Sequence, residues 1–253
     1  DAVLPRFHAK TFSKRTASAP PVVNDAAPAY GRKAVLYAAC FVEYNNPGIG
    51  RAARAVLARN GVETATAYPT CCGMPQLERG DIASVCASAE SVAVELGGWI
   101  DKGYDVVSLV PSCTLMLKTI WPRYLANDPA ISRLAAHTSD IVDYIVAIAR
   151  CEGLAKGLTP LKGGVALHHA CHARALDEGR KSAVMMRLIP DFDVLVVEGC
   201  SGHGGSWGVM KQNFPIGMKV GEPIAKQVAR SGRRYLASEC PLAGDHIAQG
   251  AER

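Results

Sequence analysis

Short runs of apolar or β-branched residues alternate with helical patterns along most of the chain. Buried strands are predicted at Ala34–Ala39, Glu63–Tyr68 and Tyr104–Val110. The segments between them, Gly48–Asn60 and Asp81–Lys102, repeat apolar residues at the spacing of an amphipathic helix. Strands that alternate with helices are typical of βαβ units, in which the strands form a parallel sheet. The pattern therefore predicts an α/β fold.

The same order of motifs occurs twice in the sequence. The matching pairs are K-A-V-L-Y-A-A-C at 33–40 with G-V-A-L-H-H-A-C at 164–171, T-C-C-G at 70–73 with G-C-S-G at 199–202, and V-P-S-C-T-L-M at 110–116 with A-S-E-C-P-L-A at 237–243. The matched cysteines are 131, 129 and 127 residues apart, which is a nearly constant shift. An internal repeat of this length predicts two tandem pseudo-symmetric lobes, each a small parallel sheet flanked by helices. We divide the chain into an N-terminal arm or linker at 1–32, a first lobe at 33–135, a helical connector at 136–162 and a second lobe at 163–253.

Each repeated cysteine follows a predicted strand. In a parallel sheet such positions all lie at the carboxyl edge, where ligands bind. The first half has four of these cysteines: Cys40, Cys71, Cys72 and Cys113. Four thiolates that meet in a small volume repel one another unless an iron–sulfur cluster or a zinc ion neutralises them. The alternative is that they are small buried hydrophobic side chains, but this does not explain why their placement is duplicated.

The second half keeps three cysteines and adds histidines. The cysteines are Cys171, Cys200 and Cys240, with Ser201 at the place of Cys72, and the histidines are His168, His169, His172 and His203. We expect His203, three residues from Cys200, to be a fourth ligand, because Cys₃His sites bind zinc and histidine also ligates some iron–sulfur clusters. The remaining three histidines and Trp207 are candidates for hydrogen-bonding or quinone-facing positions.

Composition narrows the class of protein. With 49% hydrophobic residues the chain can form a proper core. Its nine cysteines cannot all pair internally and are too sparse for a disulfide framework. We expect Cys86 and Cys151, which lie outside the repeat on predicted helices, to be core residues. The sequence has no run of about 18 apolar residues and no secretory signal pattern, so we expect a cytoplasmic protein.

Positive charge is concentrated near the start of the chain. The net charge is +5, and residues 1–33 contain six Lys or Arg against two Asp. Such an arm could tether nucleic acid or acidic lipid, but it has no dense basic run. We therefore favour a solvated linker that lies along the body, and we expect no nucleic-acid partner.

The complete cysteine series resembles a known family. The motifs C…T-C-C-G…P-S-C and C-H…G-C-S-G-H-G-G-S-W-G…E-C-P-L-A are similar to those of the cysteine-rich CCG domain, as in proteins that resemble the B subunit of heterodisulfide reductase. The resemblance extends over residues 5–250 and is strongest to the C subunits of anaerobic glycerol-3-phosphate dehydrogenases. It implies a [4Fe–4S] cluster at Cys40, Cys71, Cys72 and Cys113, and a second iron–sulfur cluster or Zn at Cys171, Cys200, Cys240 and His203.

The resemblance also implies partners. It indicates electron transfer from a flavin-dependent dehydrogenase subunit toward quinone, with peripheral contact at the inner face of the cytoplasmic membrane. Related proteins carry a ferredoxin domain, and the sequence starts without Met, so we expect a ferredoxin-like domain upstream.

The sequence departs from the family pattern C…CC…CxxC. By the alignment above, the first cysteine of each CxxC is replaced, by Val110 and by Ala237, which leaves four and three cysteines. This loss favours electron relay over disulfide cleavage. The alternatives are a zinc-stabilised docking module, a thiol or disulfide reductase of the heterodisulfide reductase type, and a quinone reductase.

Overall fold

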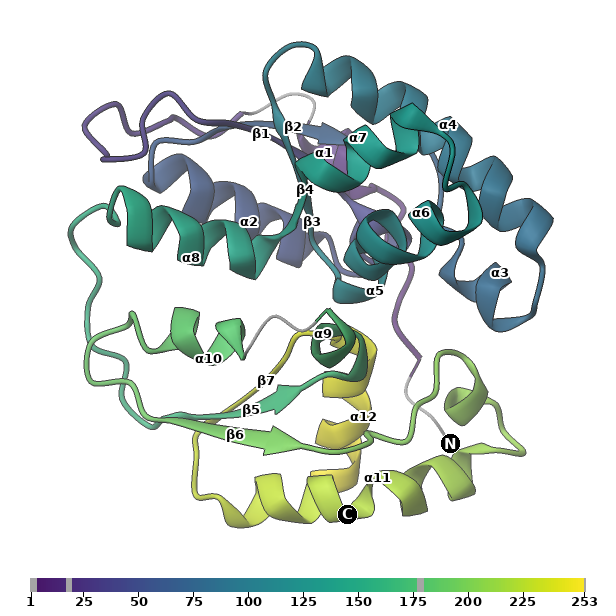
Figure 1. Cartoon of the computed structure of the whole chain (residues 1–253). Helices are drawn as coiled ribbons and strands as arrows, with labels where there is room; N and C mark the ends of the chain where they lie inside the picture. The colour runs from purple at the N-terminus through teal and green to yellow at the C-terminus, as the bar shows by residue number, and fades with distance from the viewer. Residues whose placement is uncertain (1–3, 17–19, 177–179, 253) are drawn as a thin grey trace. The chain divides into compact units, whose positions relative to one another are not determined.

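The computed structural model describes residues 4–16, 20–176 and 180–252 (Figure 1). The chain divides into two compact units, one formed by Arg6–Lys156 and the other by the residues from Gly157 onward together with Leu4 and Pro5. Each unit has a parallel sheet with helices packed around it. The structure therefore confirms the α/β class and the presence of two lobes.

The sheet of the first unit has the order β2-β1-β3-β4, with all neighbouring strands parallel. Its strands are β1 (Lys33–Tyr37), β2 (Glu63–Ala67), β3 (Asp105–Ser108) and β4 (Thr138–Asp140). The chain moves from β1 to β2 on one side and then crosses to β3 on the other side. In open α/β sheets this reversal of direction marks the place where ligands bind, at the carboxyl ends of the strands.

The helices of the first unit confirm the two predicted helices almost to the residue. They are α1 (Phe12–Thr16), the π-helix η1 (Phe41–Asn45), α2 (Pro47–Arg59), α3 (Met74–Glu78), α4 (Ile82–Ile100), α5 (Pro111–Leu115), the π-helix η2 (Met116–Ile120), α6 (Trp121–Tyr124), α7 (Pro129–His137) and α8 (Ile141–Cys151). Helix α4 begins at Asp81, whose carboxylate caps it by accepting the N–H of Ser84. Its face with Val85, Val92 and Leu96 is buried, as the helical spacing predicts.

The second unit repeats the central part of the first. Its sheet has the order β6-β5-β7, with β5 (Val165–His169), β6 (Val194–Glu198) and β7 (Tyr235–Ser238) all parallel. Its helices are α9 (Cys171–Ala175), α10 (Lys181–Met186), the 3₁₀-helix η3 (Trp207–Val209), α11 (Phe214–Arg230) and α12 (Pro241–Ala251). As in β2-β1-β3, the first strand of the unit lies between the second and the third. The topology is therefore duplicated, in agreement with the repeated motifs.

Two segments outside the predicted first lobe are built into the first unit. Strand β4 and helix α8 fall in the predicted connector 136–162, and β4 pairs with β3. In the N-terminal arm, Phe12 is fully buried, and the carboxylate of Glu43 accepts hydrogen bonds from the N–H and hydroxyl of Ser13 at 3.0 and 2.7 Å. The first unit thus extends on both sides of the range 33–135.

The expectation for the two extra cysteines was wrong for one of them. Cys151, the last residue of α8, is exposed, and Cys86 on α4 is half-buried. Helix α8 presents Tyr144, Val146 and Ile148 to the core instead. Within the described part of the chain, no helix is both long and apolar enough to cross a membrane.

Candidate metal centres

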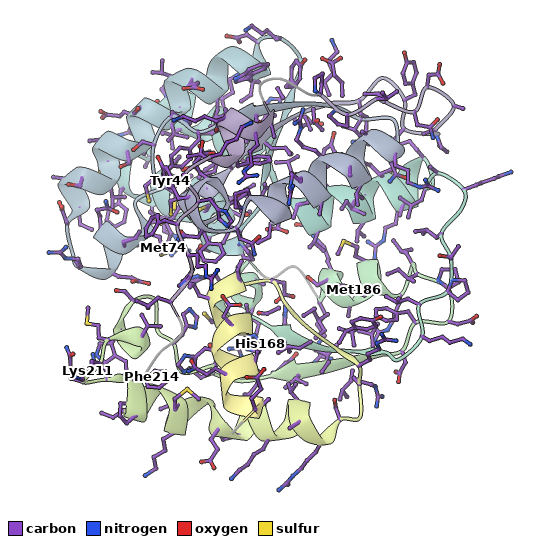
Figure 2. The ribbon with its side chains drawn as sticks, turned by 180° about the vertical axis from the view of Figure 1, so that it is seen from behind. Tyr44, Met74, His168, Met186, Lys211 and Phe214 are labelled. Atoms are coloured by element: carbon purple, nitrogen blue, oxygen red, sulfur yellow. The ribbon has the colours of Figure 1, made fainter. Side chains whose placement is uncertain are left out.

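The four cysteines of the first unit come from three neighbouring strand ends. Cys40 lies between β1 and η1, Cys71 and Cys72 lie in the loop between β2 and α3, and Cys113 lies in α5 after β3. Because β2, β1 and β3 are parallel neighbours, these positions share the carboxyl edge of the sheet. In Figure 2, sulfur atoms gather near Tyr44 and Met74, which belong to the elements that follow Cys40 and Cys72.

The side chains of these cysteines form one hydrogen-bonded chain. The thiol of Cys71 is bonded to those of Cys40 and Cys72, and Cys72 is bonded in turn to Cys113. Cys72 and Cys113 are buried, whereas Cys40 and Cys71 are partly exposed. The structure therefore brings together all four residues that the sequence assigns to the first site.

This arrangement favours one thiolate among neutral thiols. Hydrogen bonds from Cys40 and Cys72, together with the backbone N–H groups of Gly73 and Cys72, lower the pKa of Cys71 to about 3 against the effect of burial. The same hydrogen bonds, with burial, raise the pKa values of Cys40 and Cys72 above the ordinary range of a thiol. A thiolate is the form of cysteine that ligates metals, so Cys71 is already in the ligating form.

Backbone contacts hold the loop that carries the cysteine pair. Gly73 has a φ of 82°, a conformation that side chains with a Cβ rarely adopt, and it immediately precedes α3. The carbonyl oxygen of Cys72 accepts the indole N–H of the fully buried Trp121 at 3.2 Å. The carbonyl oxygen of Thr70 accepts the hydroxyl of Tyr37 at 2.7 Å. Neither Tyr37 nor Trp121 was identified from the sequence, because both read as ordinary core aromatics.

The cysteines of the second unit also follow its three strands. Cys171 begins α9 after β5, Cys200 follows β6, and Cys240 lies between β7 and α12. Cys171 and Cys200 are exposed, and Cys240 is partly buried. Burial and the nearby Cys171 raise the pKa of Cys240, so its thiol is kept neutral. The sulfur of Cys200 accepts the N–H of Gly202 at 3.4 Å.

His203 lies where the sequence predicts a ligand. Its Nε2 is 3.9 Å from the sulfur of Cys240, and its Nδ1 is 2.7 Å from the hydroxyl oxygen of Ser201. Burial and the neighbouring histidines His246, His168 and His172 lower the pKa of His203 to about 4. The imidazole is therefore neutral near pH 7, which is the form that binds metals.

The other predicted residues of the second site differ in exposure and contacts. His168, labelled in Figure 2, is buried and lies 3.0 Å from Ser238 Oγ and 3.1 Å from the carbonyl oxygen of Gly199. His169 pairs with the carboxylate of Glu239 at 3.0 Å, and the second oxygen of Glu239 accepts the N–H of Ala170. Trp207 is 46% exposed on η3. Glu239 was missed from the sequence because it reads only as the residue before Cys240.

The strand register corrects the alignment of the third cysteine. Tyr37 of β1 pairs with Ser108 of β3, and His168 of β5 pairs with Ser238 of β7. Two residues after each serine comes the N-cap of a helix, and those N-caps are Val110 and Cys240. Each N-cap is followed by a proline at the first helical position, which proline prefers.

Cys240 therefore corresponds to Val110, and Ala243 corresponds to Cys113. The sequence alignment, which matched Cys240 with Cys113 and Ala237 with Val110, is wrong by three residues. Cysteine identity misled it, whereas the proline that starts both helices gives the correct register. The first lobe thus keeps the second cysteine of the CxxC motif, and the second lobe keeps the first one.

The donor sets of the two lobes fit different metal groups. Among the described residues, no three Cys, His, Asp or Glu side chains are arranged for a single metal ion. In the first lobe, a chain of four thiols that includes a thiolate fits the thiolate ligation of an iron–sulfur cluster. In the second lobe, the contact between Cys240 and His203 fits a mixed sulfur and nitrogen ligand set.

Comparison with known proteins agrees with this cysteine pattern. Residues 34–118, which contain all four cysteines of the first site, match the cysteine-rich domain family CCG. Over most of its length the chain is similar to the C subunit of anaerobic glycerol-3-phosphate dehydrogenase of Escherichia coli (strain K12), with 26% identity over 83% of this chain and 53% of that protein. It is also similar to lactate utilization protein A of Bacillus pumilus, with 26% identity over 81% of this chain and 85% of the relative.

A third relative is the B subunit of fumarate reductase (CoM/CoB) of Methanothermobacter marburgensis, with 24% identity over 88% of this chain and 43% of that protein. The chain thus spans about half the length of the dehydrogenase and fumarate reductase subunits that it matches. All three alignments cover more of the chain than its first unit contains, so they include part of the second unit. The cysteine cluster at the carboxyl edge of the first sheet, together with these similarities, shows that the chain belongs to the cysteine-rich CCG domain family.

Proposed function

We propose that this chain is an electron-transfer subunit of an oxidoreductase, with a [4Fe–4S] cluster held by Cys40, Cys71, Cys72 and Cys113. The observation that carries the proposal is the hydrogen-bonded chain of these four thiols at the carboxyl edge of the sheet. When bound, such a cluster takes up and releases single electrons. The names of the relatives, which include a dehydrogenase subunit and a fumarate reductase subunit, support redox chemistry.

The residues around the first site would set its electrostatics. The N–H groups of Cys72 and Gly73 point at the Cys71 sulfur and stabilise negative charge on it. Such hydrogen bonds to ligand sulfur make reduction easier, while burial of Cys72 and Cys113 opposes the accumulation of charge. Backbone geometry and burial of this chain therefore tune the site in opposite directions.

For the second lobe we propose a metal centre at Cys171, Cys200, Cys240 and His203, which binds a second iron–sulfur cluster or zinc. The contact between His203 Nε2 and the Cys240 sulfur, at 3.9 Å, supports this ligand set. The hydroxyl of Ser201, 2.7 Å from Nδ1, fixes the orientation of the ring and leaves Nε2 directed at Cys240. Hydrogen bonding of the second histidine nitrogen is the usual way in which proteins orient such ligands.

The proposed donor is a flavin-dependent dehydrogenase subunit, and the proposed acceptor is quinone at the inner face of the cytoplasmic membrane. The dehydrogenase named in one relative and the exposed Trp207 beside the second site support this direction of transfer. We also propose that a ferredoxin-like domain lies upstream, as the greater length of two relatives suggests. His169 and His172 are further candidates for the quinone-facing side.

Metal analysis tests the proposed function. The chain is purified without oxygen and its iron, sulfide and zinc are measured, together with Cys72→Ser and, as a matched control, Cys151→Ser. Iron and sulfide should be present in the wild-type chain, lost in Cys72→Ser and kept in Cys151→Ser, because Cys151 is exposed and lies outside the site. A wild-type chain that binds no iron, or an unchanged Cys72→Ser variant, would overturn the proposal.

A zinc-stabilised docking module is the second candidate function. It is favoured by the neutral His203 next to Cys240, which suits zinc as well as iron. Stoichiometric zinc in both lobes, with no absorbance change on reduction, would support it. A reductase of quinones or disulfides is distinguished by reduction of a quinone analogue by the isolated chain, with loss of that activity in His203→Ala.

A further inference from the structure

Tyr37 and His168 occupy the same position in the two lobes. Tyr37 lies three residues before Cys40, and His168 lies three residues before Cys171. Each belongs to the central strand of its sheet, and each pairs with a serine of the third strand. Both side chains are buried. The strand register thus establishes their equivalence independently of the cysteine motifs.

Both residues donate to the carbonyl that precedes the next cysteine. The hydroxyl of Tyr37 donates to the carbonyl oxygen of Thr70 at 2.7 Å, immediately before Cys71. The Nε2 of His168 is 3.1 Å from the carbonyl oxygen of Gly199, immediately before Cys200. A carbonyl oxygen only accepts hydrogen bonds, so Nε2 carries the proton. A phenol and an imidazole differ in size and shape, but they make the same bond in both lobes.

The second nitrogen of His168 extends this contact to another cysteine. With the proton on Nε2, Nδ1 accepts the hydroxyl proton of Ser238 at 3.0 Å. The oxygen of Ser238 in turn accepts the N–H of Cys240 at 3.2 Å. His168 therefore connects the loop of Cys200 with the loop of Cys240, whereas Tyr37, which has one polar atom, holds only the loop of Cys71.

We propose that Tyr37 and His168 are matched positioning residues, which fix the cysteine loops of the first and second metal centres through the carbonyls of Thr70 and Gly199. The inference rests on the proposed metal-binding function. Neither residue touches a metal in this role; each restricts the backbone from which a ligand cysteine extends. Partners that orient metal ligands in this way commonly contribute about 10–100-fold to metal affinity.

The test combines two measurements on Tyr37→Phe and His168→Phe. The first is the rate at which iodoacetamide alkylates Cys71 and Cys240 in the metal-free chain, followed by peptide mass spectrometry. The second is the affinity of each site for Co²⁺ alone, measured by visible absorbance. Tyr144→Phe is the matched control, because its hydroxyl bonds Asp105 at 3.1 Å at the opposite end of β3.

In Tyr37→Phe we expect Cys71 to be alkylated about fivefold faster, as loss of one ordinary hydrogen bond allows the loop to open more often. Affinity of the first site for Co²⁺ should fall by about 10-fold, with Cys240 unchanged. In His168→Phe the effects should move to Cys240 and the second site, and His168→Gln should restore part of them by keeping one donor. Tyr144→Phe should match the wild type.

Alkylation of Cys71 at the wild-type rate in Tyr37→Phe, or an equal change in Tyr144→Phe, would overturn the inference for the first lobe. If His168→Phe does not fold, Ser238→Ala breaks the same connection, and an unchanged alkylation rate of Cys240 in that variant would overturn it for the second lobe. Failure of the wild-type chain to bind any metal would instead overturn the proposed function. The alkylation rates decide the positioning role in the metal-free chain, so the two failures are distinguishable.

Discussion

The two lobes have the same strand order, but their cysteine loops have different surroundings. In the first lobe, Cys72 is only 3% exposed and the site contains four thiols. In the second lobe two of three cysteines are exposed, and a buried ion pair lies beside them. The equivalent positions are Ala38 and His169, Leu109 and Glu239, and Cys72 and Ser201. One scaffold thus places the ligands in both lobes, and the side chains around them determine their chemistry.

The turns that carry the cysteines also pack differently. Gly73 and Gly202 have nearly identical φ angles of 82° and 83°. A Cβ on Gly73 would come no closer than 3.3 Å to Val85, whereas a Cβ on Gly202 would lie 1.9 Å from the carbonyl oxygen of Gly217. The second turn therefore lies directly against the backbone of α11. The conformation of the turn is shared, and its packing partner is not.

The largest effect is expected for Gly202→Ala. The clash with Gly217 and the left-handed backbone together should destabilise the second unit by about 2–5 kcal/mol. Denaturant unfolding measures the loss. The matched control is Gly232→Ala, which has a φ of 67° and no atom within 4 Å of an added Cβ. Equal stability of the two variants would show that the turn is not packed as described.

The next prediction concerns the ligand sets. The double variant Ser201→Cys/Ala243→Cys gives the second lobe the same cysteine positions as the first, so its iron content after reconstitution should rise. The control Ser201→Cys/Ala237→Cys follows the alignment by cysteine identity and should not gain iron. A gain in the control alone would contradict the register of β5 with β7.

A smaller difference is expected in the pH dependence of alkylation of the metal-free chain. The pKa of Cys71 is lowered to about 3, so this residue stays a thiolate as the pH falls from 8 to 5, and its alkylation rate should change little. The pKa of Cys240 is raised, so its alkylation should be slow at neutral pH and become still slower at pH 5. Parallel pH profiles for the two cysteines would contradict the contrast between the lobes.

The smallest effect is expected for Trp121→Phe. The indole donates to the carbonyl of Cys72, whereas the corresponding carbonyl of Ser201 packs against Gly221 of α11. Loss of the bond and of part of the buried ring should destabilise the first unit by about 1–3 kcal/mol. Hydrogen exchange should report this loss in the first unit and leave the second unchanged; an equal change in both would contradict it.

The sequence was sufficient for the fold class and for the cysteines at the strand ends. Alternating strand and helix patterns identify a parallel sheet, and a parallel sheet brings its strand ends to one edge. The burial of Phe12 and the pairing of β4 could not be predicted, because the composition of an arm or a three-residue Thr-Ser-Asp strand does not indicate its tertiary partner. Such contacts depend on the assembled backbone.

The roles of Tyr37, His168 and Trp121 could not be predicted for a related reason. Each donates to a backbone carbonyl far away in the sequence, and no local pattern specifies that acceptor. The register of the third cysteine was predictable in principle, because a proline follows the N-cap in both lobes. Helix-start signals are therefore more reliable than residue identity for aligning these repeats.

Electron paramagnetic resonance of the reduced chain tests the central claim most directly. Cys72→Ser and Cys200→Ser form a matched pair, one in each lobe. We expect the wild-type chain to give the signal of a reduced iron–sulfur cluster, which Cys72→Ser abolishes and Cys200→Ser leaves in place. A cluster signal that survives in Cys72→Ser, or the absence of any signal from the iron-reconstituted wild-type chain, would contradict the account.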